Sequence, residues 1–353
     1  MLDIYELLRQ AAENDASDVH ISVGVSPRFR VHGELIQTNF QKMTPSDTLE
    51  ILLNLMTHDQ REQFEEDGEI DLSVSIPQAG RYRVNAYKQR GSITLALRLV
   101  DMEIPDSDML KIPEKVRELC SIQRGLIMVT GLSGSGKSTV IASLIDEINK
   151  TRACNIITLE DPIEYLHQHK KAMVNQREIG LDVKDYATAL SAALKQDPDV
   201  LQVGTPDNAE DARLMLMAAE TGRLVFSSMY TMSAVETIEN LIDVFPEQMR
   251  DQARNRIANA LKATISRQLL LATDGHRVPA YEIMFVDNKI RDIIRNGDIY
   301  KINDRIIAGA ARGMISMDDY LLKLYNDGTI SKKTAIQAAK DQENMESRLR
   351  VLV

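Results

Sequence analysis

The feature that most constrains the fold of this chain is the stretch GLSGSGKST at residues 131–139. It fits the pattern G-x-x-x-x-G-K-[ST], in which glycines let successive backbone N–H groups curl around a phosphate. The apolar run LIMVT precedes the stretch directly, and the helix-like sequence TVIASLIDEINK continues from its end. Strand, glycine-rich loop and helix in this order predict a phosphate-binding loop, because the helix N-terminus adds a positive dipole end to the site.

The pattern assigns chemistry to individual loop residues. Lys137 is expected to reach the β- and γ-phosphates of a nucleotide, and the Ser138 hydroxyl is expected to bind Mg²⁺. We therefore predict ATP and Mg²⁺ as ligands. The predicted nucleotide-binding residues of the loop are Gly131, Gly134, Ser135, Gly136, Lys137, Ser138 and Thr139.

The loop belongs to a region whose pattern indicates a parallel sheet. The runs GLIMVTG, CNIITLED, DVLQVG and RLVFSSMY are short and mostly apolar, with helical stretches between them. This is typical of buried parallel strands joined by crossover helices. From about residue 245 onward the sequence predicts mainly helix, with RVPAYEIMFV as one late strand.

The first hundred residues predict a smaller domain of a different kind. One helix is expected after Asp3, a typical N-cap residue, and a second at SDTLEILLNLM. The alternating segments SDVHISV, RFRVHGELI, EIDLSVSI, GRYRVNAY and ITLALRLV predict strands of an antiparallel sheet. Helical spacing predicts the buried faces of the two helices: Ile4, Leu7, Leu8 and Ala11 in the first, and Leu49, Leu52, Leu53 and Met56 in the second.

Together these patterns predict an α/β protein of two domains. Residues 1–104 are expected to form an α+β domain, and residues 105–115 an acidic, proline-bearing linker. Residues 116–353 are expected to form a phosphate-loop domain with a helical C-terminal part. A chain of 353 residues is long enough for each domain to bury its own core.

Composition excludes several classes of function. The formal charge of −10 argues against nonspecific nucleic-acid binding, since neutralising phosphates needs a basic face. The two cysteines, Cys120 and Cys154, cannot supply a four-cysteine zinc site. No apolar run reaches membrane-spanning length, and the first residues lack the apolar core of a signal peptide. We therefore expect a cytoplasmic protein that contacts membranes peripherally at most.

A group of acids follows the second apolar strand. Glu160, Asp161 and Glu164 lie in TLEDPIEY, just past the carboxyl end of that strand. Ligands of parallel sheets bind outside the carboxyl ends of the strands, so one of these acids could orient the attacking water or act as its base. A solvated acidic loop at Pro162 explains the same residues. The pattern alone leaves both interpretations open.

At this point the chain resembles a known family. The segments SDVHIS, GRYRVNAY, RGLIMVTGLSGSGKST, ITLEDPIEY, VNQREIG, ALKQDPDV and AAETGRLVF follow one another in order. They resemble the secretion-type ATPases, and within them the PilT-like ATPases that power retraction of type IV pili. The late segment IRDIIRNGD is similar to the retraction-specific helix of that family. The absence of a four-cysteine cluster favours this branch over the pilus-assembly and type II secretion ATPases.

The resemblance implies a PAS-like N-terminal domain, a RecA-like motor domain and a hexameric ring whose neighbouring subunits complete each ATP site. It implies that the partners are further copies of this chain or an active PilT-like relative. A further implied partner is the inner-membrane platform protein of the pilus, reached peripherally at the inner face of the cell membrane. No nucleic-acid partner is implied.

The resemblance also implies roles for residues outside the loop. Glu160, Asp161 and Glu164 match the acidic box of the family, with Glu164 at its candidate general base. Arg81, Arg83 and Arg98 lie where arginines of the family's N-terminal domain approach the phosphates. An exposed basic face on alternating strands explains these three arginines equally well.

One motif departs from the family. After DPDV the family's strand usually ends Gly-Glu-Met-Arg-Asp, and this glutamate is the Walker B acid. Here residues 204–208 read Gly-Thr-Pro-Asp-Asn, so Thr205 replaces the acid. Arg223 and Tyr230 stand where the family has histidines. Loss of one acid–base or water-positioning group costs about two to four orders of magnitude in rate, so we expect nucleotide binding with weak hydrolysis.

The sequence is compatible with two functions. The first is a retraction-type motor in which Glu164 carries hydrolysis. The second is a nucleotide-binding, poorly hydrolysing regulatory or partner subunit of a pilus or secretion motor. A DNA-translocating ATPase is disfavoured by the acidity of the chain.

Overall fold

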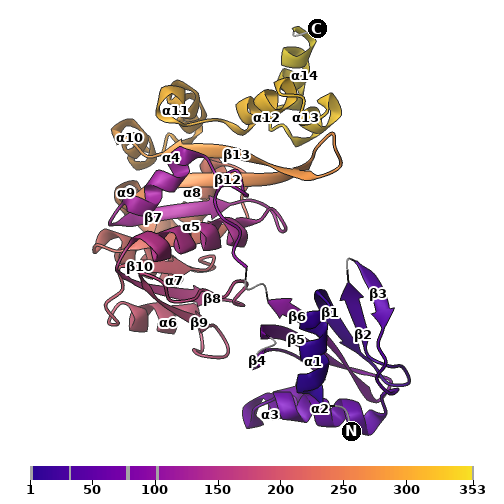
Figure 1. The fold of residues 1–353 in the computed structure, drawn as a ribbon. Helices are drawn as coiled ribbons and strands as arrows, with labels where there is room; N and C mark the ends of the chain where they lie inside the picture. The colour runs from indigo at the N-terminus through magenta and orange to yellow at the C-terminus, as the bar shows by residue number, and fades with distance from the viewer. Residues whose placement is uncertain (1–2, 32, 77–79, 101–102, 352–353) are drawn as a thin grey trace. The chain divides into compact units, whose positions relative to one another are not determined.

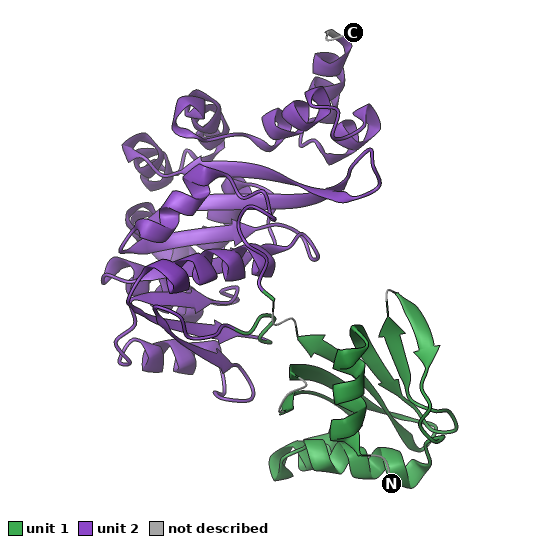
Figure 2. Cartoon of the chain, in the orientation of Figure 1, with its two compact units in different colours: residues 1–103, 162–166 green, residues 104–161, 167–353 purple. Residues whose placement is uncertain are grey.

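The computed structural model describes residues 3–31, 33–76, 80–100 and 103–351. The chain forms two compact units of mixed α/β structure, and each is described by itself (Figure 2). The first unit comprises residues 1–103 together with the short segment 162–166. The second comprises residues 104–161 and 167–353. Helices and strands carry the labels of Figure 1.

The first unit is built on a six-stranded antiparallel sheet of order β3-β2-β1-β6-β5-β4. Its strands are β1 (Ala16–Ile21), β2 (Arg28–Val31), β3 (Glu34–Gln37), β4 (Glu69–Ile76), β5 (Gly80–Gln89) and β6 (Ser92–Val100). Its helices are α1 (Ile4–Glu13), α2 (Pro45–Leu55) and α3 (His58–Asp67).

Sequence alternation places the core of this unit on one face of the sheet. The predicted apolar residues of α1 are all buried, and the Asp3 carboxylate accepts a hydrogen bond from the Tyr5 N–H at 2.9 Å, which confirms the predicted N-cap. The Tyr82 hydroxyl of β5 donates to the Leu8 carbonyl at 2.8 Å. This bond joins the sheet to the helix that covers it.

Two predictions for this unit are wrong in detail, and one helix was not predicted. RFRVHGELI is a hairpin of β2 and β3 rather than one strand, with His32 outside the described residues. Leu49 is 46% exposed, and α2 buries Thr48 and Ile51 instead. Helix α3 was not predicted, because its sequence has no apolar stripe. Of its residues only Phe64 is buried, and a Thr57–Gln60 capping box starts the helix.

The second unit contains a seven-stranded sheet of order β13-β12-β7-β11-β10-β8-β9. All neighbouring strands are parallel except the β12–β13 pair. The strands are β7 (Gly125–Thr130), β8 (Asn155–Glu160), β9 (Met173–Glu178), β10 (Val200–Val203), β11 (Leu224–Met229), β12 (Leu261–Leu271) and β13 (Arg277–Phe285).

Helices cover both faces of this sheet (Figure 1). In β7 the alternating side chains divide between two cores: Leu126 and Met128 pack with one set of helices, Ile127 and Val129 with the other. On the Ile127 side lie α4 (Glu114–Arg117) and α5 (Lys137–Thr151). On the Leu126 side lie α6 (Tyr186–Ala193), α7 (Ala209–Glu220), α8 (Ala234–Asp243), α9 (Arg250–Ala260), α10 (Asn288–Asn296) and α11 (Ile302–Ala308).

A third group of helices forms the C-terminal part of the second unit. Helices α12 (Met317–Asn326), α13 (Lys332–Ala338) and α14 (Gln342–Val351) pack together against the far ends of β12 and β13. In the described part of the chain, every helix is too short or too polar to span a bilayer.

The region after residue 245 differs from its prediction. RVPAYEIMFV is confirmed as β13, but LKATISRQLLL is the 11-residue strand β12, where the sequence predicted helix. Helix α9 passes into β12 with no turn between them, since Leu261 both caps α9 and begins β12. The usual boundary signals of glycine, proline or asparagine are therefore missing at this junction.

Candidate functional site

The phosphate-binding loop lies where the sequence places it, between a fully buried strand β7 and helix α5. Gly136 has φ +83° and forms the N-cap of α5, and Gly131 has φ +148°; L-residues with a side chain rarely adopt either conformation. A Cβ on Gly131 would lie 2.4 Å from the Arg267 carbonyl oxygen, and one on Gly136 would lie 2.1 Å from an Arg267 guanidinium nitrogen. Close packing therefore requires glycine at both positions.

Lys137 begins helix α5 and is nearly buried. Its Nζ donates to the Gly131 carbonyl at 2.9 Å and to the Leu132 carbonyl at 3.1 Å, so the side chain turns back across the loop. The Ser135 hydroxyl is also buried and makes no hydrogen bond to the described residues. A cation and an unsatisfied hydroxyl inside a glycine loop at a helix N-terminus fit a phosphate group.

The residues around the loop fit a nucleotide better than a metal alone. Ser138 occupies the first turn of α5 and is half-buried. In the described part of the chain, no cluster of three or more histidine, cysteine, aspartate or glutamate side chains could hold a metal ion. Mg²⁺ characteristically takes one or two protein ligands and completes its shell with phosphate oxygens and water. The Ser138 hydroxyl is suited to that arrangement.

Strand order decides how far the other candidate residues lie from the loop. From β7 the sheet continues through β11 and β10 to β8, all parallel, so their carboxyl ends share one edge. At about 4.8 Å per strand, the end of β11 lies about 5 Å from the end of β7, that of β10 about 10 Å and that of β8 about 14 Å. The acids after β8 are therefore the most distant of these groups.

Glu160 ends β8 and its carboxylate has local partners. The Thr158 hydroxyl donates to Glu160 Oε1 at 2.6 Å, and Gln176 Nε2 donates to the same oxygen at 3.1 Å. Gln176 belongs to the neighbouring strand β9, which the sequence did not predict as a strand. Asp161 follows Glu160 and is exposed. The sheet thus holds Glu160 in one orientation and leaves Asp161 accessible.

The remaining predicted residues belong to the first unit. Glu164 is exposed and lies in segment 162–166, which groups with that unit. Arg83 faces Arg98 across the β5–β6 pair, and Arg81 lies two residues before Arg83 on β5. Arg98 Nε donates to an Asp18 oxygen at 2.8 Å. Their part in a nucleotide site stays a prediction.

Asp18 shows that Arg98 acts as an ion-pair partner within the first unit. Burial acts to raise the pKa of Asp18, but hydrogen bonds from Ser17 and Arg98 and the charge of Arg98 outweigh it and lower the pKa below its usual value. Asp18 is buried while the Arg98 side chain is largely exposed. Arg98 therefore stabilises a buried carboxylate and still presents part of its surface to solvent.

The carboxyl end of β10 has no acid in its first positions. The Ser227 hydroxyl donates to the Gly204 carbonyl at 2.9 Å, and the hydroxyls of Thr205 and Ser228 lie 3.4 Å apart. A Cβ on Gly204 would lie 2.0 Å from the Tyr186 hydroxyl, so this tyrosine of α6 packs directly on the strand end. Ser227 and Tyr186 therefore contact Gly204, and Ser228 lies beside Thr205, the position at which the resemblance implies an acid.

The acids at this edge of the sheet also change the pKa of Tyr186. Burial raises the pKa of its phenol, and the negative charges of Asp161, Glu160 and Asp207 raise it further. The raised pKa keeps this phenol neutral throughout the physiological range. Nothing in the sequence pattern singled out Tyr186, because it is one ordinary residue of a helix far from the motif.

Arg267 is a second residue that the sequence did not indicate. It lies on β12, is 4% exposed, and donates from a guanidinium nitrogen to the Gly136 carbonyl at 2.9 Å. Its guanidinium also lies 5.8 Å from the Tyr281 ring centroid. Arg267 therefore supports the loop through a buried hydrogen bond to its backbone. It was missed because its strand was predicted as helix.

The two positions where the family has histidines lie at opposite edges of the sheet. Arg223 precedes β11 and donates to the Thr221 carbonyl at 2.9 Å, at the amino edge. Tyr230 follows β11 at the carboxyl edge, and Lys137 Nζ lies 4.1 Å from its ring centroid. Tyr230 is therefore next to the phosphate loop, and Arg223 is not.

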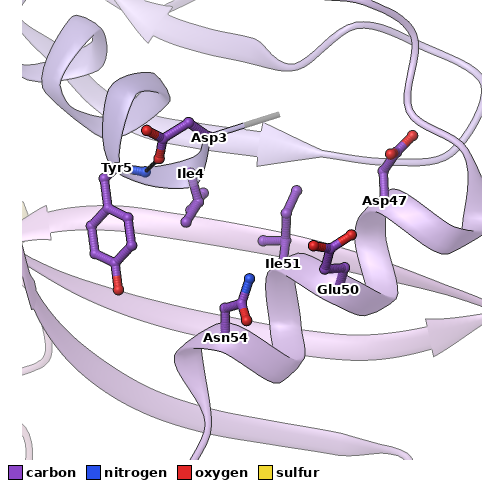
Figure 3. Close-up of a pocket in the computed structure, with 7 residues that line it drawn as sticks. All are labelled: Asp3, Ile4, Tyr5, Asp47, Glu50, Ile51 and Asn54. Carbon is purple, nitrogen blue, oxygen red and sulfur yellow. Dashed lines mark hydrogen bonds between the residues drawn. The ribbon is translucent and has the colours of Figure 1, made fainter. Parts of the chain in front are cut away.

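A separate hollow of about 210 Å³ lies between α1 and α2 of the first unit (Figure 3). Asp3, Asp47 and Glu50 contribute to its lining. Two of these carboxylates are used in helix caps, since Asp3 accepts from the Tyr5 N–H and Asp47 from the Thr44 N–H at 2.8 Å. The hollow is therefore part of the capping structure of the two helices.

Comparison with known proteins shows the family of this chain. The family model described as "Type II/IV secretion system protein" matches residues 2–340, almost the whole chain. The chain belongs to the type II/IV secretion system protein family. This membership agrees with the resemblance that the motifs indicated.

Within the family, the chain is similar to proteins of pilus retraction. It is 38% identical to "Type IV pilus retractation ATPase PilT" of Pseudomonas aeruginosa over 97% of this chain and 100% of the relative. It is 36% identical to "Twitching motility protein" of Neisseria gonorrhoeae over 97% of this chain and 92% of the relative.

A solved structure of the family has the same fold. The crystal structure of "the Pilus Retraction Motor PilT and Bound ADP" matches with a TM-score of 0.90 at 41% identity, covering 98% of this chain and 100% of that one. A family of ATPases with this fold implies nucleotide binding, which agrees with the geometry of the phosphate loop.

Proposed function

We propose that this protein is an ATP-binding motor of the kind that powers type IV pilus retraction and twitching motility. The observation that carries the proposal is the loop of residues 131–138, in which Lys137 and a helix N-terminus meet glycines that close packing requires. The retraction proteins of Pseudomonas and Neisseria, matched over nearly their whole lengths, support the motor function. They do not favour the alternative of a purely regulatory subunit.

The proposal includes finer structural assignments. We infer a PAS-like first domain at residues 1–104, a linker at 105–115 and a RecA-like ATPase domain at 116–353. The antiparallel sheet covered by helices, and the mainly parallel sheet with helices on both faces, support these assignments. Arg81, Arg83 and Arg98, with Glu160, Asp161 and Glu164, complete the proposed site around ATP and Mg²⁺.

The proposal also includes the partners and the location. The protein assembles as a homo-hexamer or with an active PilT-like relative, is cytoplasmic, and contacts an inner-membrane pilus platform protein peripherally. It does not act on nucleic acid. The net charge of −10 and the similarity to retraction motors support this part. Light scattering that shows only monomer at micromolar concentration with Mg-ATP would contradict it.

Phosphate release from purified protein tests the enzymatic function. Wild type is expected to release phosphate from Mg-ATP above the blank given by Lys137→Ala, because that lysine supplies the cation expected at the β- and γ-phosphates. Equal rates for the two proteins, both alone and with an active PilT-like relative, would contradict the motor function. Thermal unfolding with and without Mg-ATP then shows whether wild type binds without turning over.

Helix α10 is the part of the chain similar to the retraction-specific helix. Deleting residues 290–298 would disturb the core as well as this helix, because Ile290 and Ile294 are fully buried. Substituting the exposed Asp292 and Arg295 preserves those contacts. The proposal expects loss of pilus retraction in cells that carry these substitutions. Normal twitching would contradict a role for this helix.

A further inference from the structure

The contact between Lys137 and Tyr230 joins two parts of the sheet edge. Met229, the last residue of β11, pairs with Thr130 at the end of β7, and the Gly131 N–H donates to the Met229 carbonyl at 3.2 Å. Backbone register therefore places residue 230 beside the first glycine of the loop. The Lys137 ammonium lies 4.1 Å from the centre of the Tyr230 ring. This is well within the range in which a cation is attracted to the face of an aromatic ring.

The two partners of this contact differ in exposure. Lys137 is 8% exposed, whereas Tyr230 is 62% exposed. One side of the ring therefore covers the ammonium and much of the remainder faces solvent. The Gly131 and Leu132 carbonyls accept hydrogen bonds from the same ammonium. A phosphate that binds Lys137 must approach a group whose surroundings these contacts already occupy.

We propose that Tyr230 is a positioning residue that holds Lys137 by a cation–π contact and competes with nucleotide phosphates for it. Binding of a di- or triphosphate displaces the ring, so the contact lowers the affinity of the loop for these nucleotides. A cation–π contact contributes about 0.5–2 kcal/mol depending on its exposure. That range corresponds to roughly a two- to thirtyfold effect on a dissociation constant.

The inference rests on the proposed nucleotide-binding function and predicts a graded set of variants. Tyr230→Leu removes the ring and is expected to tighten ADP and ATP binding about three- to tenfold. Tyr230→Phe keeps the ring without the hydroxyl and is expected to bind within about twofold of wild type. AMP affinity is expected to be unchanged in both variants, because the loop lysine contacts the β- and γ-phosphates. A general structural effect would change all three nucleotides together.

Tyr300 offers a matched control. It is 70% exposed, and Lys301 Nζ lies 5.5 Å from its ring centroid. It follows α10 and belongs to a different part of the second unit. Tyr300→Leu therefore removes an exposed tyrosine with the same kind of cation–π contact, and it is expected to leave nucleotide affinity unchanged.

Titration calorimetry with Mg-ADP and the Mg²⁺ complex of a non-hydrolysable ATP analogue, with AMP measured by displacement, gives the affinities. Thermal unfolding without nucleotide checks that each variant is folded. Unchanged or weaker ADP binding by Tyr230→Leu would overturn the inference. So would a selective loss of triphosphate affinity in Tyr230→Phe, since it would assign the hydroxyl as a phosphate ligand. Absence of ADP binding by wild type would instead overturn the nucleotide-binding function and this inference with it.

Discussion

Two strand ends of the same sheet, about 10 Å apart by strand spacing, are built in opposite ways. At the end of β7, glycines, Lys137 and the first turn of α5 form a cationic cradle. At the end of β10, Gly204 and Thr205 meet Ser227, Ser228 and Tyr186, and no carboxylate occupies these first positions. The comparison shows that one strand end presents a cation and backbone donors, whereas the other presents hydroxyls and a phenol.

The difference follows from where each set of groups comes from. Phosphate binding depends on backbone N–H groups and one lysine within residues 131–138, so it is a local property of the chain. In the proposed function, hydrolysis depends instead on acids that lie outside this loop, such as Glu160, Asp161 and Glu164. Replacing one such acid leaves the cradle intact, and affinity and turnover can therefore be tested separately.

The largest expected effect is a loss of nucleotide affinity at the end of β7. Lys137→Ala removes the ammonium at the cradle and is expected to weaken Mg-ATP binding about tenfold to a hundredfold, because a hydrogen bond to a charged group contributes about 1.5–3 kcal/mol. Titration calorimetry measures it. Lys150→Ala is the matched control, since Lys150 lies in the last turn of the same helix. Equal affinities for the two variants would mean that the nucleotide does not bind at this loop.

The next prediction tests the catalytic half by restoring an acid. Thr205→Glu is expected to raise ATP hydrolysis at least about tenfold, which corresponds to about 1.4 kcal/mol in barrier, while Thr205→Gln is not. Glutamine has similar bulk without the charge. Adding Pro206→Met belongs in the series, because Pro206 is buried and constrains the backbone beside the new side chain. Phosphate release measures the rates.

The same series carries its own controls. Glu164→Gln added to the improved variant is expected to remove the gain, since the attacking water still needs its base. Tyr186→Phe is expected to keep the gain, because it removes the hydroxyl against Gly204 and leaves the ring in place. If wild type already hydrolyses about one ATP per second, the absence of an acid at Thr205 does not slow hydrolysis, and the two strand ends do not differ in this respect.

A smaller effect on nucleotide affinity is expected from Arg267, which donates a hydrogen bond to the loop backbone. Arg267→Met removes the hydrogen bond to the Gly136 carbonyl, and the buried Nε of this guanidinium has no hydrogen-bond partner among the described residues. We expect ADP binding to weaken about three- to fivefold, in line with the loss of one hydrogen bond of about 1 kcal/mol. The thermal midpoint without nucleotide is expected to change little, because the methionine fills the buried space. A large loss of stability with unchanged affinity would make Arg267 a core residue alone.

The smallest effect is expected far from both strand ends. Replacing the exposed Asp292 and Arg295 of α10 with alanine is expected to change ADP affinity less than twofold, although the same substitutions are proposed to stop retraction in cells. Calorimetry on the purified variant checks the first expectation. A marked change in affinity would mean that α10 communicates with the loop, and the contrast between the strand ends would then be incomplete.

Strong local signals made much of the fold predictable. The loop between β7 and α5, the cap of α1 by Asp3 and the late strand β13 all lie where the sequence placed them. Each depends on residues close in sequence: a glycine pattern, a capping side chain, or an apolar run. Such features are specified by a few neighbouring dihedral angles and survive in any fold that contains them.

Other elements could not be found in this way. Strand β12 follows α9 without a turn, and its sequence LKATISRQLLL contains charged residues that a helix accommodates equally well. It becomes a strand because neighbouring strands pair with its backbone: β7 along residues 261–266 and β13 along residues 263–271. Leu49 was placed in the core by helical spacing, yet α2 is rotated so that Thr48 and Ile51 face inward.

The sequence by itself determined that this chain has the pattern of a phosphate-binding loop and which residues form it, and the resemblance to the family showed that Thr205 stands where an acid is usual. These are statements about residue identity and short-range geometry. Only the tertiary structure decided that Arg267 supports the loop, that Tyr186 packs on the end of β10 and that Tyr230 covers Lys137. The Arg267 and Tyr230 contacts join elements that are distant in the chain, and the Tyr186 contact depends on how α6 packs on β10. Strand order, register and helix packing, which no local pattern records, bring these residues together.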